Sequence, residues 1–414
     1  MRAMSWRRRE AQPGAVTVVG LSLGALTAST FAIVALGALA PELRDEFGFS
    51  SAEVGFLISL VFIGGAISSP RAGSLTDQIG PAAVLGWSLV LFTVAMVVAA
   101  TAPNAPVFLA ALCLAGVMYA GINPPTNVVI AGRMARKVGF FLSVKQSGVP
   151  LGGLLAGVVL PPVALAFGWR WALAVTVAAC AVIAALSPRL RGAAVIGRSE
   201  PGQQGSSPLT RRDLVALGVF GFAMSGTQWS VFAHLTVFLT DERAFSLALA
   251  GLALGLVQGL GAGARLVWGW VSDIPGRRLT ILVMLAGIGA ICLVALAAGV
   301  RGLLLWLVLA IAGIAIVGWN GAYYALIADR AGAGGLGRAS ANSLVFIFGG
   351  SVVVPPFLGL SVDLSGSWRP FWAIAAAGVF LAGAALWIGL RGREPSAASD
   401  RLPGATRTGG RRSL

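Results

Sequence analysis

The octapeptide GSLTDQIG at Gly73–Gly80 returns as GWVSDIPG at Gly269–Gly276, 196 residues further along the chain. A second pair follows nearly the same offset, because Gly152-Gly153 has its counterpart in Gly349-Gly350 after 197 residues. Similarity that recurs at one offset is the mark of a duplicated structural unit. The sequence therefore predicts two related halves.

The sequence around these repeats consists of long apolar runs separated by short polar segments. A helix needs about 20 apolar residues to cross a bilayer. Twelve runs of that length are expected to span, at 15–40, 52–72, 82–101, 106–131, 139–161, 169–187, 214–239, 247–271, 279–299, 303–328, 340–361 and 370–390. We predict an all-α membrane protein with six helices in each half.

The composition supports this class. Of 414 residues, 57% are hydrophobic and 11% charged, with a mean hydropathy of +0.86, which leaves too few charges to cover a soluble protein. Cys113, Cys180 and Cys292 lie inside apolar runs and form no CxxC motif, so neither a disulfide framework nor a metal site is predicted. The basic N-terminus precedes the run 15–40, which has no clear cleavage site and is interpreted as a helix rather than a signal peptide.

The distribution of the 30 basic residues predicts the orientation. If the N-terminus is cytoplasmic, 23 of them fall on the cytoplasmic side, five outside and two within helices. The basic residues that give the net charge of +15 therefore lie mainly in the predicted cytoplasmic segments, and no nucleic-acid partner is inferred. We predict a cytoplasmic segment 1–14, helix bundles at 15–187 and 214–390, a cytoplasmic linker at 188–213 and a disordered cytoplasmic tail at 391–414.

The repeated octapeptides resemble the Gly-x-x-x-Asp-x-x-Gly loop motif of the major facilitator superfamily, and the resemblance extends over all twelve spans. It implies two six-helix bundles that rock about a central substrate site, with this loop forming part of a cytoplasmic gate. The first copy lacks the basic residues that often follow the motif. The gate residues implied are Gly73, Asp77, Gly80, Gly269, Asp273, Gly276, Arg277 and Arg278.

The fifth span contains SVKQSGVPLGG at Ser143–Gly153. Its GVPLGG is similar to the Gly-Pro-x-x-Gly-Gly motif of family antiporters but is out of register, so antiport is not inferred. Pro150 has no backbone N–H and therefore frees the carbonyl of Gln146, four residues earlier. The helix is expected to bend beside Lys145.

Three ionisable side chains lie deep within the spans: Lys145, Arg265 and His234. Lys145 and Arg265 each lie roughly 12 Å from the cytoplasmic end of a helix, and the family resemblance places both helices at the interface of the halves. Two cations without a carboxylate are costly to bury, so a small bound anion is predicted, held by Lys145 as a point charge and Arg265 as a planar fork. Alternatively, either side chain extends to the cytoplasmic interface.

The segment RLVWGWVSD, which begins at Arg265, is similar to the eighth helix of monocarboxylate and oxalate-type carriers, where an arginine binds the substrate carboxylate. Gly261 departs from that pattern, because those carriers often have an acidic residue one turn before the arginine. Carriers of the cyanate and nitroimidazole type are the nearest subgroup by resemblance.

Neutral polar residues in the spans could complete a site, although each is also an ordinary helix contact. The candidates are Gln146, Asn123, Asn127, Gln228, Gln258, Asn320, Tyr323 and Tyr324. His234 is predicted either to carry a coupling proton or to be a neutral histidine bonded to a backbone carbonyl.

We predict a monomeric secondary transporter of the inner membrane that moves a carboxylate or inorganic oxyanion by alternating access, with protons or a counter-anion as coupling partners. An exporter of uncharged or cationic compounds is the alternative within the same class, and a non-transporting membrane sensor is the alternative outside it. No catalytic set, cofactor motif or metal cluster indicates an enzyme.

Overall fold

A computed structural model describes residues 13–134, 138–192, 210–271 and 277–391, without the side chains of 138–139, 328–329 and 331–342. Within this part of the chain, twelve helical segments are long and apolar enough to cross a membrane, which confirms the predicted fold class. The helices of the first half are α1 (Ala15–Ala38), α2 (Ala40–Phe47), α3 (Ser51–Ile79), α4 (Pro81–Ala100), α5 (Ala105–Tyr119), α6 (Asn123–Arg133), α7 (Val138–Gln146), α8 (Gly148–Phe167), α9 (Trp169–Leu186) and the short 3₁₀ helix η2 (Ser187–Leu190). Those of the second half are α10 (Arg211–Arg243), α11 (Leu247–Val271), α12 (Arg278–Ala297), α13 (Gly302–Ala312), the π-helical turn η3 (Gly313–Val317), α14 (Asn320–Ser365) and α15 (Trp368–Leu390).

Several helices run beyond their apolar segments. The polar stretch at 73–79, expected in a loop, is the last part of α3, and only Gly80 forms the turn, with φ of +89°. The segment between the tenth and eleventh spans is helical as well, within α14. α10 begins at Arg211 rather than 214, because Thr210 and Asp213 form a capping box. Most of the predicted terminal segments and linker lies outside the described residues.

The two halves meet along three helix pairs: α3 with α14, α8 with α11, and α1 with α10. Glycines make close approach possible at these crossings, since a Cβ added at Gly55 would lie 2.4 Å from the carbonyl carbon of Pro355, and one at Gly157 would lie 2.4 Å from the carbonyl oxygen of Gly251. Small residues thus define where one half can pivot on the other.

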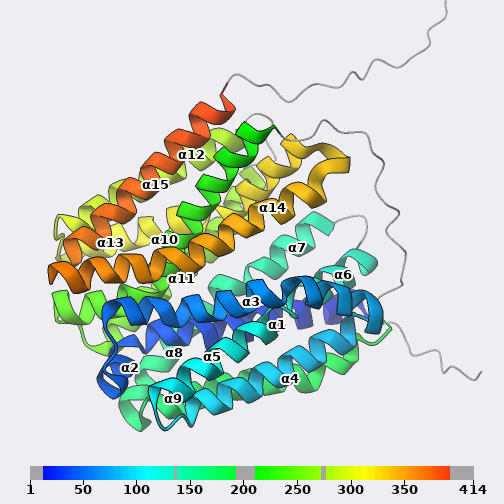
Figure 1. Cartoon of the computed structure of the whole chain (residues 1–414), viewed down its shortest axis with the longest axis horizontal. Helices are drawn as coiled ribbons and strands as arrows, with labels where there is room; N and C mark the ends of the chain where they lie inside the picture. Colours follow the sequence, from blue (N-terminus) through cyan, green and yellow to red (C-terminus); the bar gives the residue numbers. More distant parts are fainter. Residues whose placement is uncertain (1–12, 135–137, 193–209, 272–276, 392–414) are drawn as a thin grey trace, which may run out of the picture.

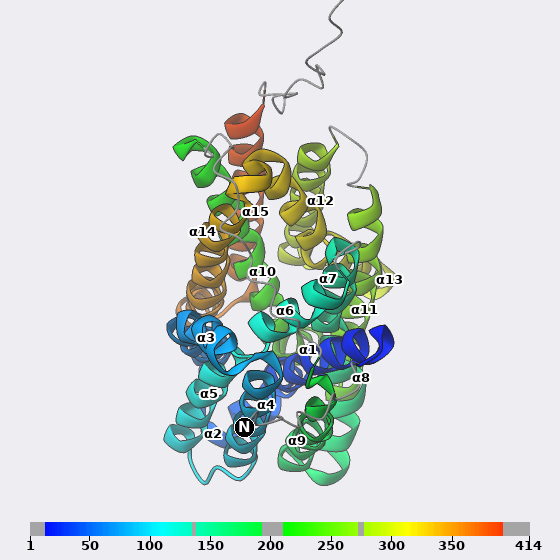
Figure 2. The ribbon, with the colours of Figure 1, turned by 90° about the vertical axis from the view of Figure 1, so that its right-hand side faces the viewer.

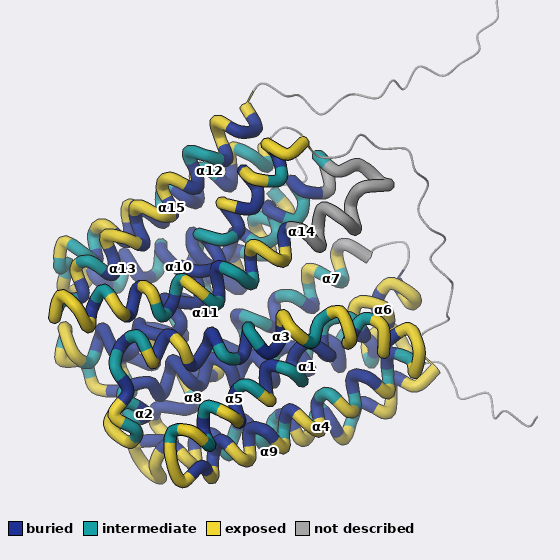
Figure 3. The backbone as a smooth tube through the Cα atoms, in the orientation of Figure 1, coloured by how far each residue is buried: buried dark blue, intermediate teal, exposed yellow. Residues whose placement is uncertain are grey.

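Large apolar side chains cover the outside of the bundle. Ile291, Val345 and Leu303 are 70%, 71% and 85% exposed, and the tube in Figure 3 shows exposed positions recurring along the outward faces of the helices. Such a surface suits lipid rather than water. The protein is therefore a multi-pass membrane protein.

The end of the bundle at which α1 begins and α15 ends is called the termini end, and the opposite end the far end (Figure 1). At the far end, the Arg44 guanidinium pairs with the Asp241 carboxylate of the other half at 2.7 Å. The Thr236 hydroxyl donates across the same boundary to the carbonyl of Gly37. Toward the termini end, seen face-on in Figure 2, the helices of the two halves spread apart. The far end is therefore the closed end.

Candidate functional site

The fifth span is broken where the sequence predicts it. α7 ends at Gln146 and α8 begins at Gly148, with Ser147 between them. Pro150 cannot donate to the carbonyl of Gln146. That carbonyl instead accepts a hydrogen bond from Nη1 of Arg265, at 3.1 Å. The interruption of the fifth span in the first half thus leaves a free carbonyl on Gln146, which accepts a hydrogen bond from Arg265 in the second half.

Arg265 lies on α11 and is held by a second irregular segment. Its Nε donates to the carbonyl of Val317 at 2.9 Å, at the end of the π-helical turn η3. π-helical turns are rare and frequent at functional sites. The guanidinium has five N–H groups, and the ones not used in these two bonds have no hydrogen-bond partner among the described residues. Because the side chain is only half-buried, these donors are available to a ligand.

Lys145 is in a different environment, since its side chain is fully buried. Its Nζ donates to Oδ1 of Asn127 at 2.6 Å and to Oδ1 of Asn123 at 2.9 Å, and it lies 3.5 Å from Oγ1 of Thr126. All three acceptors belong to α6, which begins at Asn123 because Pro124-Pro125 occupy its first turn. The structure brings together three predicted site residues, Lys145, Asn123 and Asn127, but directs their polar atoms at one another.

Other predicted candidates are satisfied within the second half. Oε1 of Gln228 accepts from Nε1 of Trp319 at 3.0 Å and from Nδ2 of Asn320 at 3.4 Å. The Tyr323 hydroxyl donates to the carbonyl of Leu217 at 3.0 Å. These contacts hold α10 and α14 together, and the Tyr323 side chain is fully buried.

Gln258 is the exception among the buried amides. It is fully buried on α11, two turns from Arg265, and neither amide atom has a hydrogen-bond partner in the described part of the chain. The amide packs against Gly153, where an added Cβ would lie 2.1 Å from its Nε2. Buried amides without hydrogen-bond partners are uncommon in native structures, so Gln258 stands out at this crossing of α8 and α11.

Two tyrosines lie near Arg265. Tyr324 is among the predicted candidates and Tyr119 is not, and the hydroxyls of both lie near the guanidinium. The Phe62 ring contacts Tyr119, and it lies 4.6 Å from the Trp229 ring of the second half, centroid to centroid. Tyr119 lies four residues before Asn123, a spacing that places both on one side of a helix and that could have drawn attention to it.

The predicted gate residues are spread over the termini end. Asp77 is exposed on α3 and forms no ion pair with a described residue. Gly73 lies within the same helix and Gly269 within α11. Arg277 precedes α12, and Nη1 of Arg278 donates to the carbonyl of Ala325 at 3.0 Å. Asp273 and Gly276 lie outside the described residues.

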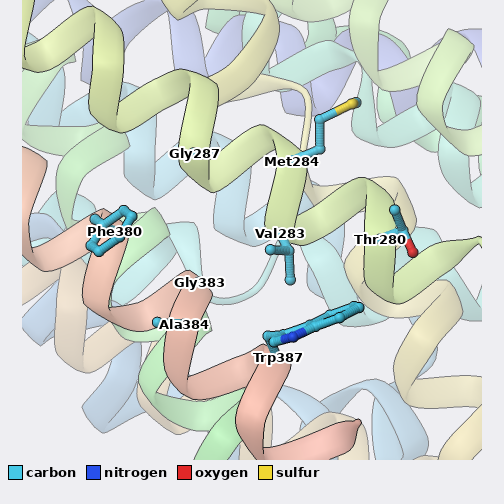
Figure 4. A pocket seen from close by; sticks show the side chains of 8 residues that line it. All are labelled: Thr280, Val283, Met284, Gly287, Phe380, Gly383, Ala384 and Trp387. Carbon is cyan, nitrogen blue, oxygen red and sulfur yellow. The ribbon is translucent and has the colours of Figure 1, made fainter.

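A separate pocket of about 430 Å³ lies between α12 and α15. Figure 4 shows the Val283 side chain of α12 directed toward Trp387 of α15, while Met284 of α12 points away from α15. Its lining is apolar except for Thr280 and the Trp387 indole nitrogen, and Phe380 is 60% exposed on the outside of the bundle. This pocket suits an acyl chain and has no charge to hold an anion.

The fold, two six-helix halves with a cation at their boundary, defines a membrane transporter. A family model of the Major Facilitator Superfamily matches residues 21–348, and the chain belongs to this family. It is a transporter and not an enzyme.

Two relatives and one solved structure illustrate the match. A gentisate transporter of Corynebacterium glutamicum is 33% identical over 34% of this chain, and this match spans only 32% of the relative's length. A gallate transporter of Pseudomonas putida is 27% identical over 65% of this chain and 68% of its own length. A bacterial homolog of the human lysosomal transporter Spinster, in an inward-facing and occupied conformation, superposes with a TM-score of 0.77 at 15% identity, over 90% of this chain and 96% of that one. The last similarity concerns the fold alone.

Proposed function

We propose that this protein transports a small aromatic carboxylate by alternating access, with Arg265 as the ligand of the carboxylate group. The observation that carries the proposal is the half-buried guanidinium, oriented by two backbone carbonyls and retaining unused N–H donors. A guanidinium of this kind binds a carboxylate through parallel hydrogen bonds.

The aromatic part of the substrate class has two sources of support. Tyr119 lies near the arginine, and the Phe62 ring that contacts it extends this aromatic surface to Trp229 of the second half. Ring stacking adds to the burial of apolar area. Gentisate and gallate, the compounds in the names of the two relatives, are both hydroxybenzoates. A substrate of this shape would place its carboxylate on Arg265 and its ring against these side chains.

Lys145 then has an indirect role. Its donors are already directed at Asn123, Thr126 and Asn127, so we assign it to fixing α6 against α7 and to adding positive potential beside Gln146. In this proposal only Arg265 contacts the anion directly, whereas the sequence analysis predicted contacts from both Lys145 and Arg265. An inorganic oxyanion would need no aromatic surface and is the less favoured substrate.

The orientation proposed from the basic residues makes the termini end cytoplasmic and the far end external, in a bacterial inner membrane. With the far end closed, this conformation would open to the cytoplasm. The predicted gate residues would then be separated, in keeping with Asp77, which is exposed and forms no ion pair with a described residue.

Uptake by purified protein in liposomes tests the function. We expect labelled gentisate or gallate to accumulate and an excess of the unlabelled acid to compete. Transport of a cationic dye without transport of either acid would favour the exporter alternative. Absence of transport and of ligand-induced thermal stabilisation with a panel of aromatic acids would favour a non-transporting sensor.

A further inference from the structure

His234 lies on α10 near the far end, and its side chain is fully buried. Its Nδ1 lies 3.1 Å from the carbonyl oxygen of Ser230, one turn earlier. Its Nε2 lies 2.9 Å from the carbonyl oxygen of Ser51, the first residue of α3 in the other half. Both ring nitrogens therefore face oxygen atoms that can only accept hydrogen bonds.

A neutral imidazole carries one N–H, and its second nitrogen presents a lone pair. Either neutral tautomer would satisfy one of the two carbonyls and set lone pair against lone pair at the other. An imidazolium donates from both nitrogens. The contacts of His234 therefore match the protonated ring.

The charges around the ring come from two elements. The Asp363 carboxylate of α14 is near enough to favour the protonated form, whereas Arg44 of α2 opposes it but is paired with Asp241. α15 contributes the rings of Trp368 and Phe371. Burial opposes the charge most strongly, whereas the carbonyls of Ser51 and Ser230 and the Asp363 carboxylate all favour it.

The same contacts join the two halves. Ser51 is held twice from the second half, because its carbonyl faces His234 and its N–H donates to Asp363 at 2.8 Å. The N–H of Ala52 donates to the other oxygen of Asp363, also at 2.8 Å. Separation of the halves at the far end must break all of these bonds.

We propose that His234 is a proton-binding site and that its protonated form holds the far end closed. The proposal rests on the alternating-access function above but not on the identity of the substrate. Loss of the proton leaves one N–H for the two carbonyls and removes the positive charge that strengthens the bond to Ser51, which favours opening. Exposed Asp363 lies beside this contact and connects it to the water at the far end.

Spin labels attached at Pro103→Cys and Leu303→Cys, in a background without native cysteines, report the separation of the halves at the far end. The full chain is measured in lipid nanodiscs without substrate, across about pH 5 to 9, the range in which histidine titrates. We expect one short distance at low pH and a growing longer component as the pH rises. A distribution that does not change with pH in the otherwise unmodified protein overturns the proposal.

Three variants identify the titrating group. His234→Gln, which cannot gain a proton, should lose the pH response. Asp363→Asn should shift its midpoint to lower pH by about one unit, because the favourable charge is gone. Glu242→Gln, a change at a far-end carboxylate paired with Arg243 in its own half, should leave the response intact.

A pH response that persists in His234→Gln, or a midpoint unchanged in Asp363→Asn, contradicts the assignment. The second variant decides the question by itself if the first fails to fold. Gentisate binding is measured on the same samples. Binding without a pH response overturns the proton site alone, whereas a pH response without binding of aromatic acids counts against the proposed substrate alone.

Discussion

Lys145 and Arg265 are two cations of similar predicted depth, but the structure gives them different surroundings. The lysine is fully enclosed, and its three donors face side-chain oxygens of one neighbouring helix. The arginine is half-buried and donates to two backbone carbonyls, and its other donors have no partner in the part of the chain that the structure describes. Depth in the membrane indicates that a charge has a role, and the partners of that charge determine whether a ligand can reach it.

The two residues also differ in which halves they connect. The partners of Lys145 belong to its own half, whereas those of Arg265 come from both, Val317 from the second and Gln146 from the first. Under the proposed alternating access, a change in the relative position of the halves alters the contact with Gln146 and with it the number of donors that Arg265 offers.

The largest effect is expected for Arg265→Ala. Loss of two charge-assisted hydrogen bonds to a carboxylate corresponds to about 3 kcal/mol, or roughly 100-fold in affinity. Equilibrium binding of labelled gentisate by the detergent-purified protein measures this. Arg265→Lys keeps the charge without the fork and should lose about tenfold.

Thermal unfolding supplies the control for both variants, because a half-buried arginine should be removable without loss of the fold. Gentisate affinity within threefold of the unmodified protein in Arg265→Ala would show that the carboxylate binds elsewhere.

The next effect, on stability, is expected for Lys145→Ala. This change removes a buried aliphatic stem and leaves oxygens of Asn123 and Asn127 without donors, which should cost about 3 kcal/mol of unfolding free energy. Lys145→Met keeps most of the stem and should cost less. Gentisate affinity should fall by no more than about tenfold in Lys145→Met, since the lysine acts through position and potential. If Lys145→Met is folded and stable but binds no gentisate, the indirect role is wrong and the lysine contacts the substrate directly.

The smallest effect is expected for Pro150→Ala. The new N–H can bond to the carbonyl of Gln146, competing with Arg265 and straightening the junction of α7 and α8. We expect gentisate affinity to fall by about threefold to tenfold, the equivalent of roughly 1 kcal/mol. Pro70→Ala, at the exposed proline inside α3, is the matched control and should bind normally. Equal losses in both variants would show a general effect of helix straightening.

The sequence predicts the parts of this structure that one helix determines by itself. Apolar length locates the spans, and Pro150 locates the free carbonyl of Gln146. It does not predict where a helix ends outside the membrane. Hydropathy identifies the residues that lie in lipid, whereas α3 continues through polar residues such as Asp77.

The sequence does not predict the contacts between helices. The rotation of α7 that turns Lys145 toward α6 depends on packing, as does the meeting of Phe62 with Trp229 across the halves. Neither is encoded in the spacing of residues along one chain. The other acceptor of Arg265, the carbonyl of Val317, is likewise not predicted, because it lies at the end of the π-helical turn η3.

The most direct test of the central claim compares a matched pair, gentisate and gentisamide, on the unmodified protein and on Arg265→Ala. The amide keeps the ring and its hydroxyls but lacks the charge. We predict that the unmodified protein binds the acid at least about 100-fold more tightly than the amide and that Arg265→Ala binds both equally weakly. A preference for the acid that survives in a folded Arg265→Ala would contradict the assignment of Arg265 as the carboxylate ligand.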